Sequence, residues 1–308
     1  MDKQIKVPDG LNKTMIAFLK ENMNFSGRKT KRLLKDGLVL LNNKKAYGDS
    51  KIKDGDIICF LKQKAKSDYI FPQKMPLSIL FEDEYLLIID KAPFISMLPS
   101  KVYGCSLANG IRYYFDQNNI KEPVRFYNRL DMNTSGIVMI PKDGQTHSLL
   151  ERYSSKTIIK KYQVVVSGIP RVKNGIINKP ISVDADERGE RYITNKGKDA
   201  ITKYTLIEAF PNSSLLDIQI ETGRTHQIRI HMNSIGHSVI GDILYGVKTQ
   251  LIKRQALHAY RLVFLHPIKK QSLTIESPLP EDMKELISAL KKKHILSFDE
   301  IRDKSKGY

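Results

Sequence analysis

The residues between 128 and 140 hold the acid of this chain that is best placed to do chemistry. Asp131 follows Arg129 by two positions, and a tight turn at 134–136 leads into a run of β-branched and apolar residues. An acid on a rigid turn before a buried strand is held in one place, as catalysis requires. The alternative is a structural aspartate that accepts hydrogen bonds from nearby backbone N–H groups.

A second polar cluster lies at residues 222–246, where TGRTHQIRIHMNSIGH is followed by a GD pair and a YG pair. Three of its apolar residues recur at the spacing of a buried helical stripe: Ile228, Met232 and Ile235. Arg229 lies off that stripe, where it can meet an anion. His226 and His231 are five positions apart rather than four and have no cysteine nearby, so we expect no metal site.

Both clusters resemble one known family. Residues 129–136 match the R-L-D-x-x-T-S-G signature of the RluA-type pseudouridine synthases, and residues 222–246 are similar to that family's T-G-R-T-H-Q-I-R block. The segment KKYQVVVSG at 160–168 resembles a third family motif, K-x-Y-x-x-x-V-x-G. A partial match at 81–91 extends the resemblance, which runs from about residue 78 to 268.

The resemblance implies a role for several residues. Asp131 would be the catalytic residue, with Arg129, Tyr162 and Arg229 as active-site support. Arg229 would be the partner of Asp131 and would orient it through two parallel hydrogen bonds. Tyr162 would stack on the target base, although a half-buried tyrosine of a strand is the alternative.

Three further residues are candidates to contact RNA: Lys161, Arg224 and His226. The alternatives are a solvated lysine at 161 and a hydrogen-bonding scaffold role for His226. Many family members begin the first motif with histidine, where this chain has Asn128. Asparagine still offers a hydrogen-bond donor and an acceptor, so we expect an altered contact and a retained activity.

The implied reaction breaks a glycosidic bond, turns the uracil base and joins its carbon five to the sugar. It needs a carboxylate, a stacking surface and a base taken out of its stack, but no metal and no cofactor. The sequence leaves open whether Asp131 attacks the sugar, adds to the base or assists a glycal intermediate.

The bulk composition fits an RNA partner. The chain has 308 residues and a formal net charge of +18, which suits a polyanion. No apolar run approaches the ~20 residues of a membrane span, and MDKQIKVPDG has no signal core. Cys59 and Cys105 are interpreted as buried, reduced thiols. We therefore expect a cytoplasmic monomer that does not bind membranes.

The charge is concentrated at the N-terminus, where residues 1–74 hold 17 Lys and Arg against 8 Asp and Glu. A helix capped by Ser26 and ended by Gly37 carries five candidate RNA-binding residues: Arg28, Lys29, Lys31, Arg32 and Lys35. Two helices followed by a hairpin resemble the RNA-binding domain of the ribosomal-protein-S-four type. The alternative is a solvated basic helix.

The chain is predicted to divide into four parts: an S-four-like domain at 1–62, a linker at 63–75, a catalytic domain at 76–280 and a tail at 281–308. Long runs of strands without a βαβ repeat predict an α+β fold with a mixed, mostly antiparallel central sheet flanked by helices. Helical patterns occupy about 105–117, 143–153 and 225–236.

Three other functions fit the sequence less well. The first is a catalytically inactive RNA-binding factor of ribosome assembly. The presence of all four expected active-site residues argues against it: Arg129, Asp131, Tyr162 and Arg229. An RNA methyltransferase lacks a Gly-rich loop after a strand, and a membrane-surface protein lacks a suitable amphipathic helix outside the tail. The added RNA-binding domain favours large-subunit ribosomal RNA over transfer RNA as the substrate, while the uridine that is modified cannot be identified.

Overall fold

A computed structural model describes residues 3–23, 25, 27–61, 70–99, 104–187, 189–246 and 249–304. The chain separates into two compact units, Met1–Tyr69 and Ile70–Tyr308, and the boundary falls within the predicted linker. Residues 63–69 of that linker and the predicted helix cap Ser26 lie outside the described residues. So do the side chains of Arg28 and Lys29.

The first unit joins two short helices to small antiparallel sheets. One sheet has the order β1-β6-β3-β4, and β2 pairs with β5. Thr14 caps α1 by accepting a hydrogen bond from the N–H of Ala17, and Gly37, with a φ of +67°, follows α2. The elements are β1 (Lys3–Lys6), β2 (Lys13–Thr14), α1 (Met15–Glu21), α2 (Gly27–Lys35), β3 (Val39–Leu41), β4 (Lys44–Lys45), β5 (Lys51–Ile52) and β6 (Ile57–Phe60).

This unit has a hydrophobic core of its own, built from the apolar stripes of both helices and the inner faces of the strands: Val7, Met15, Phe18, Leu19, Leu34, Val39, Ala46, Ile52 and Ile58. Both predicted helices and the two strands after them are present. The strand at Lys3–Lys6 was not anticipated, because four residues are too few to show a period. Lys31, Arg32 and Lys35 are exposed on α2.

The second unit is built on a nine-stranded sheet of order β11-β12-β13-β10-β14-β9-β8-β7, with β15 added beside β14. All of its strand pairs are antiparallel except β9 with β14, which confirms the mixed, mostly antiparallel sheet. The strands are β7 (Ser78–Glu82), β8 (Leu86–Lys91), β9 (Ser135–Pro141), β10 (Ile159–Ser167), β11 (Asn174–Asn178), β12 (Ile201–Phe210), β13 (Ser213–Ile220), β14 (Leu257–Leu265) and β15 (Ser272–Glu276).

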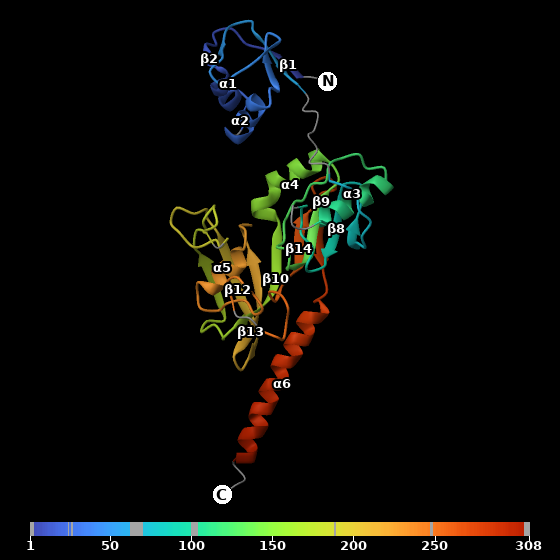
Figure 1. Cartoon of the computed structure of the whole chain (residues 1–308), viewed down its shortest axis with the longest axis vertical. Coiled ribbons are helices and arrows are strands. Elements are labelled where there is room, and N and C mark those ends of the chain that lie inside the picture. The colour runs from blue at the N-terminus through green and yellow to red at the C-terminus, as the bar shows by residue number, and fades with distance from the viewer. Residues whose placement is uncertain are drawn as a thin grey trace. The chain divides into compact units, whose positions relative to one another are not determined.

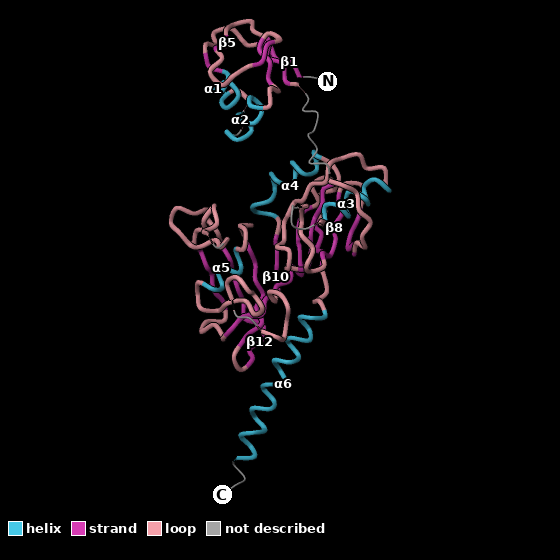
Figure 2. Tube along the Cα trace, in the orientation of Figure 1, coloured by secondary structure: helices cyan, strands magenta, loops and turns pink. Residues whose placement is uncertain are grey.

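Within the described residues, α3 (Leu107–Gln117), α4 (Gly144–Thr157) and α5 (Gln227–Asn233) lie against this sheet (Figures 1 and 2). Helix α6 (Glu281–Lys304) begins at the sheet and extends away from it. Helix α4 contacts β9 and β14, and both α5 and α6 contact β12. Asp143 caps α4 by accepting a hydrogen bond from the N–H of Thr146. The α+β fold class is therefore confirmed.

The start of the predicted tail packs on the second unit. Met283 and Leu286, spaced along one face of α6, are buried in a cluster with Val165, Phe210 and Leu215. Their spacing of three residues puts them on the same side of a helix. This contact ties the first turns of α6 to the central strands of the sheet.

The single parallel pairing sets the position of the polar turn found in the sequence. His258 pairs with Ser135, and Ala259 pairs with Gly136, where β14 and β9 run side by side. Gly136 has a φ of +114°, and a Cβ there would lie 2.3 Å from the carbonyl oxygen of Ala259. Only glycine fits this approach, which explains its place directly before the apolar run.

Candidate active site

Asp131 lies on a closed turn just before β9. The N–H of Thr134 donates to the carbonyl of Asp131 at 3.0 Å, and Thr134 and Ser135 are both buried. Ser135 Oγ lies 2.9 Å from His258 Nδ1, which joins the turn to the neighbouring strand. Hydrogen bonds therefore hold the turn both at Asp131, through its carbonyl, and at Ser135, where the turn enters β9.

Asn128 fixes the beginning of the same segment. Its Nδ2 donates to the carbonyl of Ile137 at 2.9 Å, and its Oδ1 accepts from the N–H of Met139 at 2.9 Å. Both polar groups of the amide are thus used on the backbone of β9. The residue that replaces the family's usual histidine holds the motif against its strand.

Two buried cations lie beneath the turn. Lys91 Nζ donates to the carbonyl of Met132 at 3.0 Å and to two carbonyls of its own segment, Ala92 and Ile95. Burial, with the nearby Arg254, lowers the pKa of Lys91 to about 7. Arg254 Nη1 donates to the carbonyl of Asn133 at 3.2 Å. The carbonyls of two consecutive residues after Asp131, Met132 and Asn133, are therefore each bound by a buried basic side chain.

Arg254 also reaches the C-terminal helix. Its guanidinium forms a two-pronged ion pair with Asp282, in which Nε lies 2.6 Å from Oδ2 and Nη2 lies 2.8 Å from Oδ1. The arginine side chain is fully buried, whereas Asp282 is partly exposed in the first turn of α6. One arginine thus connects α6 to the turn that carries Asp131.

Arg229 on α5 contacts Asp131, as the sequence predicts. Its Nη1 lies 3.0 Å from Asp131 Oδ2, and 7% of its side chain is exposed. The predicted pair of parallel bonds to Asp131 is wrong, because that side of the guanidinium faces Asp242. Nε and Nη2 donate to Asp242 at 2.6 and 2.8 Å, so Arg229 bridges two carboxylates.

The pair of Arg229 and Asp242 is buried on all sides. Desolvation alone would raise the pKa of Asp242, but the hydrogen bonds and charge of Arg229 lower it below its usual value. The N–H groups of Leu244 and Tyr245 also donate to this carboxylate. Asp242 therefore remains ionised at neutral pH and holds Arg229 in place.

His226 and Tyr245 complete this end of the site. His226 Nε2 lies 3.9 Å from Asp131 Oδ1, and its Nδ1 lies 3.0 Å from the Tyr245 hydroxyl. Burial lowers the pKa of His226, although the charge of Asp131 opposes this. Arg229 lies over the ring of Tyr245 at 5.0 Å from its centroid. His226 thus contacts the acid as a neutral imidazole at pH 7.

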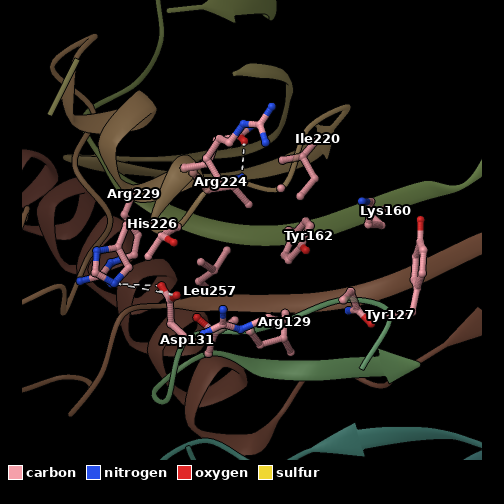
Figure 3. Close-up of a pocket in the computed structure, with 17 residues that line it drawn as sticks. Tyr127, Arg129, Asp131, Lys160, Tyr162, Ile220, Arg224, His226, Arg229 and Leu257 are labelled. Carbon is pink, nitrogen blue, oxygen red and sulfur yellow. Dashed lines mark hydrogen bonds and ion pairs between the residues drawn. The ribbon is translucent and has the colours of Figure 1, made fainter. Parts of the chain in front are cut away.

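Asp131, Arg229 and His226 face a pocket of about 250 Å³ (Figure 3). Its polar end carries Asp131, Arg229 and His226, and Tyr162 of β10 lies farther along it. Four apolar side chains contribute to the wall, Leu130, Ile220, Ile228 and Leu257, and most of the other lining residues are polar or charged. A concave site that combines apolar surface with fixed polar groups can hold a flat organic ligand and orient it.

Tyr162 is a pocket residue and not only a core residue. Only 5% of it is exposed, and burial together with the charge of Asp131 raises the pKa of its phenol. The hydroxyl is therefore protonated at neutral pH, and the ring offers a fixed flat surface. The predicted stacking role is compatible with this placement.

The remaining predicted site residues are Arg129, Arg224 and Lys161, and only the two arginines lie at the pocket. Arg129 and Arg224 are exposed at the pocket, and Arg224 Nε donates to the carbonyl of Asp199. Lys161 is not among the described residues that line the pocket. Its ammonium lies 2.7 Å from Asp217 Oδ2, so the sheet already supplies its counter-ion.

Sequence reasoning missed several residues of the site. It assigned no role to Asp242, Tyr245, Lys91, Lys160 or Arg254. The GD and YG pairs near residue 245 were visible as motif letters, but only the fold shows that they surround Arg229. The two buried cations gave no local signal, because a lysine at the end of a strand usually reaches water.

Two further findings concern ions and membranes. Within the described ranges, no group of three or more His, Cys, Asp and Glu side chains is arranged to hold a metal ion. Among the same residues, no helix is long and apolar enough to cross a membrane.

Comparison with known proteins agrees with this geometry. Residues 85–234 match the family model described as RNA pseudouridylate synthase. The chain is 36% identical over 266 residues to the RNA pseudouridine synthase YjbO of Bacillus subtilis, which covers 84% of this chain and 94% of that protein. It is 32% identical to ribosomal large subunit pseudouridine synthase D of Xylella fastidiosa, over 96% of this chain and 95% of that protein.

A solved structure shows the same fold. Human RNA pseudouridylate synthase domain containing 4 aligns with a TM-score of 0.56, covering 70% of this chain and 93% of that one, at 21% identity. At this identity the likeness concerns the fold alone.

Proposed function

The chain belongs to the RluA-type family of RNA pseudouridine synthases, and from that premise we propose that Asp131 is its catalytic carboxylate and large-subunit ribosomal RNA its substrate. The family makes the protein an isomerase that converts uridine to pseudouridine in RNA. The proposal goes beyond the family assignment in two respects: it names Asp131 as the catalytic residue and large-subunit ribosomal RNA as the substrate.

The observation that carries the assignment is the way Asp131 is held at the pocket. The acid is 25% exposed, and Arg229 fixes one of its oxygens at 3.0 Å. Of the pocket-lining residues that the structure describes, Asp131 alone is a carboxylic acid. A carboxylate fixed beside a base-sized pocket is what cleavage and re-formation of a bond to a sugar require.

The pocket residues suit the steps of this reaction. A uridine taken out of its stack would place its base against the flat ring of Tyr162 and its sugar beside Asp131. Arg229 would keep the acid in position while the bond breaks and forms again. Attack on the sugar, addition to the base and formation of a glycal all use the same placement of Asp131.

The choice of RNA rests on relatives and charge. Several similar proteins are named ribosomal large subunit pseudouridine synthase D. In this chain, residues 1–62 hold 14 Lys and Arg, and α2 presents exposed cations. We therefore propose that the first unit is an S-four-like module that docks a large structured RNA, and that transfer RNA is the alternative substrate.

Replacing Asp131 with asparagine tests the acid. Cells lacking the protein would be complemented with wild type, Asp131→Asn or the control Asp199→Asn, whose side chain is exposed near the same pocket. Pseudouridines would then be mapped in large-subunit ribosomal RNA and in transfer RNA. We expect wild type and the control to restore sites in ribosomal RNA and Asp131→Asn to restore none.

Each part of the proposal can fail separately. Purified Asp131→Asn should bind RNA within a few-fold of wild type, because the substitution changes charge and not shape. Activity of Asp131→Asn within ten-fold of wild type would remove Asp131 from the mechanism. Pseudouridines restored only in transfer RNA would overturn the choice of substrate and leave Asp131 untouched.

A further inference from the structure

Two adjacent lysines of β10 have opposite surroundings. Successive side chains of a strand point to opposite faces of the sheet, so Lys160 and Lys161 cannot share an environment. Lys161 lies 2.7 Å from Asp217 Oδ2. Lys160 lines the pocket, and within the part of the chain that the structure describes its ammonium makes no hydrogen bond or ion pair, lying only over the ring of Tyr127 at 5.9 Å.

The surroundings of Lys160 disfavour an unpaired charge. Burial lowers the pKa of this lysine, and no carboxylate opposes that effect. A cation taken partly out of water without a partner costs free energy. The contact with the ring of Tyr127 offsets only part of this cost. An anion brought by the substrate would supply the missing partner.

The position of Lys160 indicates which part of the substrate it meets. In Figure 3, Lys160 and Tyr127 lie at one end of the pocket, Asp131 and Arg229 lie at the other, and Tyr162 lies between them. A base stacked on Tyr162 with its sugar beside Asp131 leaves the phosphodiester chain to enter or leave past Lys160. Phosphate oxygens are the usual partners of such a lysine in RNA complexes.

We propose that Lys160 binds a backbone phosphate next to the target uridine and so sets the path of the RNA strand into the pocket. The inference deepens the proposed function and depends on RNA being the substrate. It replaces the contact that sequence reasoning gave to Lys161, whose charge Asp217 already balances.

The two lysines supply a matched pair of variants. Lys160→Met and Lys161→Met each remove one positive charge from the same strand and keep most of the side chain's length. Total RNA from cells lacking the protein would be the substrate, because it contains every candidate target unmodified. Initial rates of pseudouridine formation by the full-length protein would be measured over a range of salt concentrations.

A phosphate contact predicts a specific pattern. For Lys160→Met, KM should rise about ten-fold or more, as expected for loss of a charged hydrogen bond, while kcat stays within about two-fold. The slope of log(kcat/KM) against log salt should become shallower by about 0.7, the value for one phosphate of single-stranded nucleic acid. Lys161→Met should leave KM and slope near wild type, and Lys160→Arg should restore most of the affinity.

Other outcomes overturn the inference. An unchanged salt slope with a lower kcat would mean that Lys160 contacts the base and not a phosphate. Equal losses in both variants would mean that only the net charge matters. Melting temperatures measured in parallel separate misfolding from lost contacts. If pseudouridine forms only in transfer RNA, the proposed substrate fails, but the comparison of the two lysines still decides the role of Lys160.

Discussion

Replacing Arg229 with methionine should lower the unfolding free energy of the second unit by about 3–5 kcal/mol, as expected when one partner of a buried ion pair is removed. Methionine keeps the apolar volume of the side chain but leaves Asp242 with no cation. Asp242 has no exposed surface and Arg229 only 7% of its side chain, so water cannot replace the lost bonds. Asp131, which is 25% exposed, can be solvated and should contribute little to this loss.

The effect should also depend on pH in a definite direction. In the wild type the folded-state pKa of Asp242 lies below its unfolded value, so its pairing adds stability above about pH 4 that is lost as pH falls through the folded pKa. Without Arg229, burial raises the folded-state pKa above the unfolded one. The folded variant then binds more protons than its unfolded chain, and its stability falls as pH rises through that interval. The deficit relative to wild type should widen from pH 4 to pH 7.

Calorimetry suits this measurement, because the chain has no tryptophan whose fluorescence could follow unfolding. We expect one transition for each of the two compact units. The expected loss corresponds to a fall of about 6–20 °C in the midpoint of the second unit, from about 2–4 °C per kcal/mol. Arg261→Met is the matched control, since Arg261 and Glu276 form an exposed pair worth about 0–1 kcal/mol. A loss for Arg229→Met no larger than that control, or one that does not grow with pH, would refute the reasoning.

Two further predictions concern the ligand surfaces. Tyr162→Phe should keep more pseudouridine-forming activity than Tyr162→Leu, because phenylalanine retains the flat ring that lines the pocket; equal losses would implicate the hydroxyl, and no loss in either would return Tyr162 to a core role. Deletion of residues 1–69 should weaken binding to ribosomal RNA and make its salt dependence shallower, while slow modification persists at high RNA concentration because the second unit has its own core. An unchanged affinity and salt slope would mean that the first unit does not dock RNA.

The sequence was informative where local pattern and function coincide. The acid at 131, the arginine at 229 and the tyrosine at 162 stand in short motifs, and the structure brings all three to one pocket. Runs and spacings of apolar residues predicted several strands and three helices of the second unit. The strands at 174–178, 257–265 and 272–276 were not predicted, because short or mixed segments carry little periodic signal.

The remaining features of the site depend on long-range contacts that no local pattern reveals. Asp242 takes the two-pronged bond that the sequence analysis gave to Asp131, because α5 turns one side of Arg229 away from the pocket. For a similar reason, the lysine of β10 that lines the pocket is Lys160 and not Lys161, to which the sequence analysis gave an RNA contact. Their alternation across the strand was predictable, but which face meets the pocket depends on the strands that pair with β10.

The bond between Arg254 and Asp282 has a consequence for the timing of synthesis. A ribosome makes the turn at Asp131 before it makes α6. While the turn folds, Arg254 therefore cannot yet pair with Asp282. Until Asp282 has been made, burial of Arg254 beside the carbonyl of Asn133 would leave its positive charge without this counter-ion. The turn that carries Asp131 therefore gains this support only after Asp282 has been made. A protease that cuts between β15 and α6 would remove that support while leaving every motif residue in the chain.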